Sequence, residues 1–394
     1  MSGSPRRIGR PVRGESLRHR MMKMQVAEKR IERLSFDKIF YYPDHLRALV
    51  EEREAYPIHM QLGTVNYCNH DCTFCYAARS MFDARQAPRT RIDVERLMEI
   101  IEEMVPLGLR SVTLVGSGEP TLHPRVDEII TGLHQRGVDV GLFTNGSCLT
   151  DRTLRAIVEH TTFVRFSLTG ATREVHDLVH ANGDFERVIG NIRRVAQART
   201  GPFPTLGTQF ILASYSAGDV VRGAALAKEL GMDYYEIKPA YVAPDKPDQL
   251  ENTLTVADAI PLLEQAKAYE DERFRVYTKM EQVEKVFVNI DDRPYDDCPG
   301  HKTTAVLEAD LNLYICVNHK VPSMCFGNLT EHSFREVWHG PRRKEILSQL
   351  DVHTCVPRCR QDPINRIVHE IRCGDRVIPL NPPAPDPQEH PTFL

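Results

Sequence analysis

The stretch Cys68-Asn69-His70-Asp71-Cys72-Thr73-Phe74-Cys75 places three cysteines within eight residues, at C-x3-C-x2-C spacing. Three thiolates at this spacing can hold one small iron–sulfur cluster and leave one iron without a protein ligand. A structural zinc site needs four protein ligands, and no fourth Cys or His stands at the usual spacing, although His70 stays open as a ligand. A disulfide framework needs pairs of cysteines. The spacing therefore predicts a cluster with an open coordination position.

Length and composition limit the class of protein. A chain of 394 residues is long for one domain and short for three, so we expect one large core with a smaller one attached. Basic and acidic residues are mixed, with a formal charge of −4, which predicts no nucleic-acid partner. The lack of a long apolar run or an apolar signal segment predicts a cytoplasmic protein without a membrane partner. In that reducing compartment, clustered cysteines bind metal more often than they form disulfides.

Strands and helices alternate through the first two thirds of the chain. Six apolar strands are expected, at 58–63, 112–115, 138–143, 163–168, 206–212 and 234–237. Helices are expected at 97–105, 124–136, 150–159, 185–198 and 218–230, after a helical segment within 24–55. Such alternation is typical of an α/β fold with a parallel sheet, either open or curled into a barrel.

Glycine-rich or polar turns follow four of these strands, on the edge that the cysteine stretch also occupies. They are Gly116-Ser117-Gly118-Glu119-Pro120, Thr144-Asn145-Gly146, Ser167-Leu168-Thr169-Gly170 and Lys238-Pro239. One such turn alone is usually only a tight turn. Because chemistry gathers at the carboxyl ends of parallel strands, four of them beside a cluster loop predict a ligand-binding rim.

The cysteine stretch, with Phe74 before its last cysteine, and the Gly-Glu-Pro turn at 118–120 together resemble the radical S-adenosylmethionine (SAM) enzymes over about residues 56–240. The resemblance implies a partial (β/α)6 TIM-like barrel and a [4Fe–4S] cluster whose open iron is chelated by SAM. Reduction then splits SAM into methionine and a 5′-deoxyadenosyl radical that abstracts hydrogen from a substrate. The implied cluster ligands are Cys68, Cys72 and Cys75. The implied SAM contacts are Phe74, Tyr76, Gly116, Gly118, Glu119, Asn145 and Ser167.

Two details of this resemblance leave alternatives open. Ser117 stands where many relatives have glycine, which affects the contact with the SAM amino group. Turn capping without any ligand contact is the structural alternative for Asn145 and Ser167.

A second group of cysteines lies beyond residue 245, where the alternation ends. A helix is expected at 255–270 and a strand at 274–277, and a hairpin of strands 304–308 and 313–316 would bring Cys316 towards Cys298. A helix at 333–350 then leads to Cys355 and Cys359. With the turn at 327–329 and Asn365, this region resembles the SPASM extension, or its one-cluster form called twitch.

The resemblance to that extension implies a second [4Fe–4S] cluster on Cys298, Cys316, Cys355 and Cys359. A four-cysteine zinc site is the alternative. Cys325 or Cys373 could replace Cys355, although each also fits a small buried apolar residue.

These observations predict five segments. They are a disordered basic leader at 1–20, a barrel with amino-terminal helices at 21–245, a linking helix and strand at 246–297, a small α+β auxiliary-cluster domain at 298–380, and a Pro-rich tail without a role in a core at 381–394.

The expected function is oxidation of a small metabolite, such as a sugar or aminocyclitol, with the auxiliary cluster as electron acceptor and flavodoxin or ferredoxin as reductant. Rim position alone suggests substrate contacts from Gln209, Glu236, Lys238 and Tyr241. A redox-neutral epimerase or decarboxylase, with Cys148 returning a hydrogen atom, is one alternative. A peptide-modifying enzyme and a non-catalytic iron–sulfur electron carrier are the others.

Overall fold

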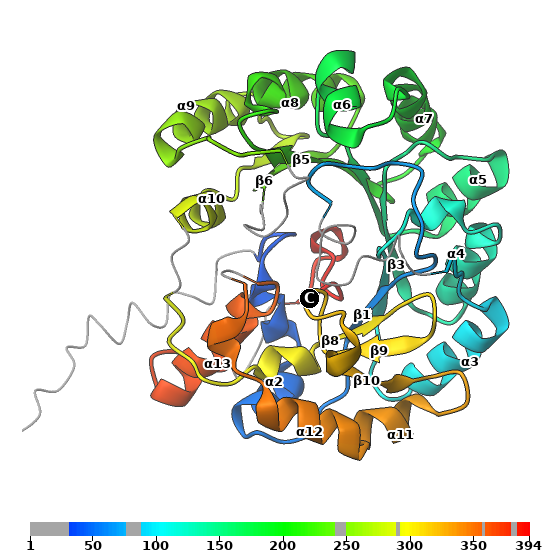
Figure 1. Ribbon diagram of the computed structural model, residues 1–394, viewed down its shortest axis with the longest axis vertical. Helices are drawn as coiled ribbons and strands as arrows, with labels where there is room; N and C mark the ends of the chain where they lie inside the picture. The colour runs from blue at the N-terminus through cyan, green and yellow to red at the C-terminus, as the bar shows by residue number, and fades with distance from the viewer. Residues whose placement is uncertain (1–30, 76–87, 241–249, 289–291, 357–358, 380–383) are drawn as a thin grey trace, which may run out of the picture.

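The computed structural model describes residues 31–75, 88–240, 250–288, 292–356, 359–379 and 384–394 (Figure 1). Its centre is one sheet of ten strands in the order β10-β9-β8-β1-β2-β3-β4-β5-β6-β7. The strands are β1 (His59–Leu62), β2 (Ser111–Leu114), β3 (Asp139–Thr144), β4 (Phe163–Ser167), β5 (Thr205–Leu212), β6 (Tyr234–Pro239), β7 (Arg275–Tyr277), β8 (Thr304–Leu307), β9 (Asn312–Tyr314) and β10 (Cys325–Asn328).

Strands β1 to β7 pair in chain order and run parallel, as the alternation of strands and helices predicted. The carboxyl-terminal hairpin joins the same sheet, because β8 pairs parallel with β1 from His59 and Thr304 onward. Strands β9 and β10 follow antiparallel. The second cysteine group is therefore attached directly beside the strand that leads into the first.

Helices cover the outer face of the curved sheet, and Figure 1 shows α3 to α9 as an arc around β2 to β6. They are α2 (Pro43–Val50), α3 (Val94–Met104), α4 (Val126–Gln135), α5 (Asp151–His160), α6 (Arg173–His180), α7 (Phe185–Ala198), α8 (Val220–Glu229), α9 (Val256–Lys267), α10 (Met280–Val288), α11 (Phe334–His339), α12 (Pro341–Gln349) and α13 (Asp362–Cys373). Their apolar faces form one large core with the sheet. None of the described helices is long and apolar enough to cross a membrane.

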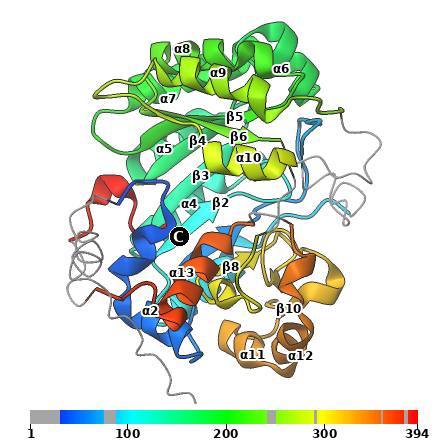
Figure 2. The same cartoon turned by 90° about the vertical axis from the view of Figure 1, so that its left-hand side faces the viewer.

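The described helices differ from the sequence prediction in two ways, since α6, α10 and α13 were not expected and one expected helix is divided in two. Helix α6 was not expected; it begins after Thr172, whose hydroxyl accepts from the Val175 N–H. The single helix expected at 333–350 is two helices, because the chain turns at Gly340 and restarts at Pro341, a residue that suits a first helical position. Figure 2 shows α11 and α12 at the end of the molecule opposite α8 and α9.

The closing residues 387–394 pack against the amino ends of the barrel strands, so the expectation of a tail outside the core is wrong for them. Phe393 is buried and meets the Phe163 ring edge-on, with the ring centroids 4.8 Å apart. The His390 ring stacks on the same phenylalanine, and the Ser111 hydroxyl donates to the carbonyl of Thr392 at 2.6 Å. Figure 1 places the end of the chain in the middle of the ring of strands. The closing segment thereby covers the amino edge of the barrel and leaves the opposite, carboxyl edge for the cysteine loop.

Candidate iron–sulfur and SAM site

The three-cysteine loop follows β1 and is held by the carboxyl end of α6. The backbone N–H of Asp71 donates to His180 O at 3.2 Å, and that of Thr73 donates to Val179 O at 2.9 Å. The carbonyl of Cys72, which lies between Asp71 and Thr73 in the loop, accepts the Cys75 N–H. Helix α6 leaves its last carbonyls free to take these bonds, so it fixes the course of the loop.

Nitrogen donors surround the sulfur atoms of this loop. The His70 N–H donates to Cys68 Sγ at 3.4 Å, and Asn145 Nδ2 lies 3.8 Å from the same sulfur. His180 Nδ1 lies 3.2 Å from Cys72 Sγ. Burial raises the pKa of the Cys72 thiol well above its usual value, and the neighbouring thiols Cys75 and Cys68 raise it further. Bound iron and these donors would offset both costs, so the residues fit a cluster held by thiolates.

Glu119 is the residue that joins the glycine-rich turn after β2 to the turn after β3. Its buried carboxylate accepts from the Thr121 N–H at 3.0 Å and from the Thr121 hydroxyl at 2.7 Å. The Thr144 hydroxyl donates to it at 2.6 Å and the Asn145 N–H at 2.7 Å. Four donors on one buried carboxylate make Glu119 a clamp between the two turns.

The two glycines of the turn after β2 are needed for close backbone approach. A Cβ at Gly118 would lie 2.3 Å from Tyr67 O, one residue before the first cysteine of the loop. A Cβ at Gly116 would lie 2.6 Å from Gly63 Cα, at the end of β1. Since real Cβ atoms do not approach so closely, glycine lets this turn lie directly on the cluster loop.

Asn145 holds the cluster loop through its side chain. Its Nδ2 donates to Asn69 Oδ1 at 2.9 Å, and its Oδ1 accepts the Ser147 N–H. The Ser147 hydroxyl donates to Asp184, which also bonds His70 Nε2 at 3.0 Å. Asn145 thus builds its turn, and its side chain also approaches Cys68 Sγ, while its contact with SAM stays a prediction.

Three other expected residues lie around the loop. The Phe74 ring meets the His180 ring edge-on, with centroids 5.6 Å apart. Ser167 ends β4 on the same rim, in register with Gln209 of β5. Asn69 Nδ2 lies 3.8 Å from Cys148 Sγ, which brings that thiol to the cluster loop. Burial raises the pKa of Cys148, so it keeps its proton at neutral pH. Tyr76 lies outside the described residues.

A buried ion pair connects the SAM-type turn to the carboxyl-terminal hairpin. Lys320 Nζ donates to Glu308 Oε1 at 2.7 Å and to the Ser117 hydroxyl at 2.8 Å. The Ser117 hydroxyl in turn donates to Glu308 Oε2 at 3.2 Å. Ser117, the departure from the usual glycine, therefore has a contact of its own. It connects the turn to the strand end that precedes Cys316.

The structure gathers the second group of cysteines around the hairpin and the segment before α13. Burial raises the pKa of Cys316 to about 12, with Cys359 and Cys355 among the neighbouring charges that add to the shift. Burial also raises the pKa of Cys298, where Cys359 and Cys316 contribute. Each of the four expected thiols is therefore within electrostatic range of at least one other.

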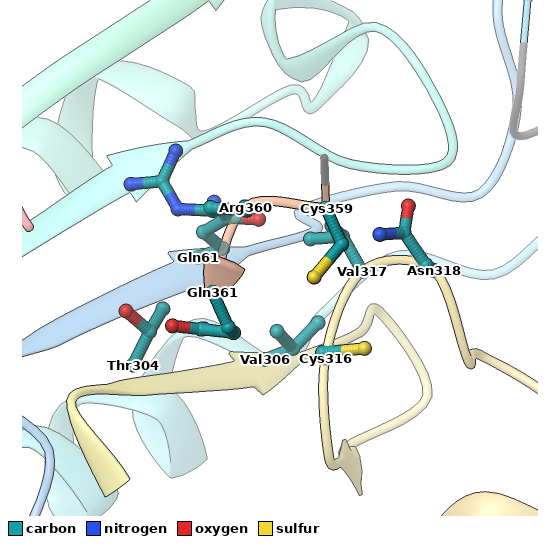
Figure 3. Close-up of a pocket in the computed structure, with 9 residues that line it drawn as sticks. All are labelled: Gln61, Thr304, Val306, Cys316, Val317, Asn318, Cys359, Arg360 and Gln361. Carbon is teal, nitrogen blue, oxygen red and sulfur yellow. The ribbon is translucent and has the colours of Figure 1, made fainter. Parts of the chain in front are cut away.

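Nitrogen donors and open space accompany this second group. Asn365 Nδ2 donates to Cys298 Sγ at 3.4 Å, and His319 Nε2 lies 3.3 Å from Cys355 Sγ. A small pocket lies between β1, β8 and these cysteines, with Cys316 and Cys359 in its lining (Figure 3). The thiols and the nitrogen donors around them are of the kind that holds a cluster.

The two remaining cysteines of this region lie elsewhere. Cys325 Sγ donates to Gly327 O at 3.5 Å, within β10. Cys373 is exposed at the end of α13, 3.6 Å from His369 Nε2.

The expected substrate contacts form a charged group inside the barrel. Gln209 and Glu236 are neighbours in register on β5 and β6. Glu236 forms a buried ion pair with Arg165 at 2.7 Å and lies 3.6 Å from Lys238 Nζ. Burial alone would raise the pKa of Glu236, but Arg165 and Lys238 overcome it and hold the pKa at about 2. Tyr241 lies outside the described residues.

Several site residues escaped the sequence analysis. Arg165 shares one face of β4 with Phe163 and Ser167, and only the pairing of three strands brings it to Glu236. His180 belongs to a helix that was not expected. Two signals, the cap at Thr172 and the glycine before it, could have located that helix. Lys320 and Glu308 belong to no sequence motif that would have indicated their contact.

The fold and the site together define a class of protein. A parallel partial barrel with a three-cysteine loop after its first strand, a glycine turn after its second and a further cysteine group beside the sheet is the architecture of a two-cluster, SAM-dependent iron–sulfur enzyme.

Comparison with family models agrees with this class. The model of the radical SAM superfamily matches residues 63–219, and the SPASM model, an iron–sulfur cluster-binding domain, matches residues 298–361. The radical SAM domain and the SPASM domain that the motifs predicted are both found in this chain. These domains imply SAM and a [4Fe–4S] cluster, with an auxiliary cluster in the SPASM domain.

Curated relatives have diverse activities. The chain is 35% identical over 83 residues to an S-adenosylmethionine-dependent nucleotide dehydratase of Flammeovirga pacifica, covering 21% of this chain and 28% of that protein. It is 25% identical over 175 residues to a probable GTP 3′,8-cyclase of Saccharolobus islandicus, covering 44% and 54%. An AdoMet-dependent heme synthase of Methanosarcina barkeri is 23% identical over 289 residues, covering 69% and 79%. The first two matches thus span a quarter to a half of those relatives.

Solved structures share the fold. SuiB of Streptococcus suis bound to S-adenosylmethionine superposes with a TM-score of 0.62 at 15% identity, covering 84% of this chain and 77% of that one. The protein anSMEcpe with bound AdoMet gives 0.56 at 16% identity, covering 74% and 83%. Identity this low shows a common architecture and does not transfer a substrate.

Proposed function

We propose that this protein is a radical SAM oxidoreductase that removes two electrons from a small polar metabolite. Cys68, Cys72 and Cys75 hold the first cluster, and Cys298, Cys316, Cys355 and Cys359 hold the auxiliary one. Held there, the SAM-bound cluster supplies hydrogen-atom abstraction, and the auxiliary cluster supplies an acceptor for the electron that the oxidation leaves behind.

The observation that carries this proposal is the junction between the two cysteine groups. Lys320 and Glu308, on the hairpin that leads to and from Cys316, bond directly to Ser117 in the SAM-type turn. The hairpin itself continues the barrel sheet through β8 and β1. Two redox centres attached to neighbouring strands of one rigid sheet favour electron transfer over a purely structural second cluster.

The interior charges favour a substrate with an acidic group. Arg165, Lys238 and Lys279 act on the buried carboxylate of Glu236, and Glu32 is a second carboxylate near Lys279. Three cations face two carboxylates among these described residues, which leaves positive charge in excess. Glu236 is engaged by Arg165 at 2.7 Å, whereas Lys238 is farther away and its side chain is 31% exposed. A carboxylate or phosphate on the substrate would balance this excess, with Lys238 as its partner and Gln209 beside it.

A redox-neutral reaction is the second candidate, because Cys148 lies at the cluster loop as a protonated thiol that could return a hydrogen atom. The test is incubation of the reduced two-cluster protein in D2O with SAM and a panel of acidic sugars, nucleotides and amino acids. Oxidation predicts one 5′-deoxyadenosine per oxidised product and no deuterium at the attacked carbon. Deuterium in an unoxidised product, lost in Cys148→Ser, would favour the redox-neutral reaction. Turnover of a peptide alone would contradict the metabolite proposal.

A further inference from the structure

His180 lies between the cluster loop and the turn after β4. It is the last residue of α6 and is fully buried. Its Nδ1 lies 3.2 Å from Cys72 Sγ, within hydrogen-bond distance of a sulfur acceptor. Its other ring nitrogen, Nε2, lies 3.1 Å from the backbone nitrogen of Thr169.

The second contact determines which nitrogen of His180 carries the proton. A backbone N–H can only donate, so Nε2 must accept from Thr169 through its lone pair. A ring whose Nε2 keeps its lone pair carries no hydrogen on that atom, so the imidazole is neutral. A neutral imidazole has one N–H, which is therefore on Nδ1 and points at Cys72.

This orientation also decides between two roles for the local cluster of donor atoms. His70, Cys72 and His180 offer ligand atoms within 4.8 Å of one another, which is compact enough for a metal ion. Because Nδ1 of His180 carries hydrogen, it has no lone pair for a metal on the Cys72 side. The contact is a hydrogen bond to sulfur.

The His180 ring has little freedom to leave this position. The His176 ring lies 4.5 Å away and the His70 ring 5.4 Å away, centroid to centroid, and Phe74 covers another edge. The carbonyl of His180 accepts the Asp71 N–H, so the same residue binds the loop through its backbone and through its ring.

We propose that His180 is a positioning residue that donates a hydrogen bond to the Cys72 thiolate and raises the reduction potential of the first cluster. The inference rests on the assignment of Cys72 as a cluster ligand. A reduced cluster carries one more negative charge, which an N–H directed at its ligand sulfur stabilises more than it stabilises the oxidised cluster. His180 thereby eases the electron uptake that must precede SAM cleavage.

The test is a redox titration of the two-cluster protein, monitored by electron paramagnetic resonance. The first cluster is recognised as the signal that changes when SAM is added. We expect His180→Leu to lower the ratio of reduced to oxidised first cluster about tenfold at a fixed applied potential. For a one-electron couple, this change corresponds to a reduction potential lower by about 59 mV. His180→Gln, whose amide can donate, should restore most of the ratio. His59→Leu, which replaces a fully buried histidine at the amino end of β1, should leave it unchanged. Equal ratios in His180→Leu and the parent, or equal shifts in both leucine variants, would overturn the proposal.

A second measurement needs no variant, in case His180→Leu does not retain iron. Protein labelled with 15N only in the imidazole rings of histidine, so that the His70 backbone N–H beside Cys68 stays silent, is reduced, and electron–nuclear double resonance of the same signal is recorded in H2O and D2O. The proposal predicts a histidine 15N coupling and an exchangeable proton. Absence of both would refute the hydrogen bond. Neither readout requires turnover, so a failure of the proposed oxidation leaves this test interpretable.

Discussion

Replacement of Glu119 by Gln should weaken SAM binding by displacing the turn after β3. The carboxylate takes four donors, three on Oε1 and one, the Asn145 N–H, on Oε2. Glutamine has one oxygen for these donors. In its better orientation, the oxygen keeps the three donors and the new NH2 group faces the Asn145 N–H.

The expected loss of stability in Glu119→Gln follows from the number of donors that lose a charged acceptor. One buried N–H loses its acceptor, at about 1–3 kcal/mol, and the bonds that persist fall from charge-assisted strength to about 0.5–1.5 kcal/mol each. The clamp thus weakens by several kcal/mol. Since Asn145 also bonds the cluster loop, we expect at least a tenfold rise in the Kd for SAM, or about 1.4 kcal/mol.

Isothermal titration of SAM into the oxidised, iron-loaded protein measures this effect, with the urea midpoint as the stability readout. Glu128→Gln is a matched control, because that carboxylate is partly exposed and pairs at the surface with Arg125 and Arg152. Unchanged affinity and midpoint in Glu119→Gln would refute the clamp.

Three further predictions concern other parts of the molecule. Cys316→Ala should lose the auxiliary iron and keep the first cluster's signal, whereas Cys325→Ala should lose no iron, as iron content and Mössbauer spectra will show. Glu236→Gln leaves the Arg165 guanidinium buried without its anion and should cost about 3–5 kcal/mol of stability, measured by urea unfolding. Burial lowers the pKa of Lys38 to about 7 from 10.5. The unfolded chain therefore binds more protons between these values, and stability should rise with pH from 7 to 10.5. Lys38→Met should flatten that rise, as urea midpoints across this range will show.

The sequence predicted the fold where the signals were local. Each barrel strand is a short apolar run, and the face of residues 185–198 repeats with helical period, so α7 was placed at its observed bounds. The Gly340-Pro341 break is also visible in the sequence, but the prediction of one helix over 333–350 crosses it. Helix α6 is only eight residues long, and three of its buried positions are His176, Val179 and His180, which dilutes the apolar pattern.

Contacts between distant segments could not be predicted in the same way. The ion pair of Arg165 and Glu236 depends on the register of β4, β5 and β6 together. The closing segment reads as a Pro-rich tail until Phe163 is seen between His390 and Phe393. The two cysteine groups differ from these contacts, because cysteine spacing and family resemblance were enough to predict cluster binding from the sequence.

The most direct test of the central claim is the amount of 5′-deoxyadenosine formed from SAM by the reduced protein and by its Cys72→Ala variant under the same conditions. The account predicts 5′-deoxyadenosine from the parent protein, increasing with a substrate, and none from the variant. Equal amounts from both proteins, or none from the iron-loaded parent with any candidate substrate, would contradict it.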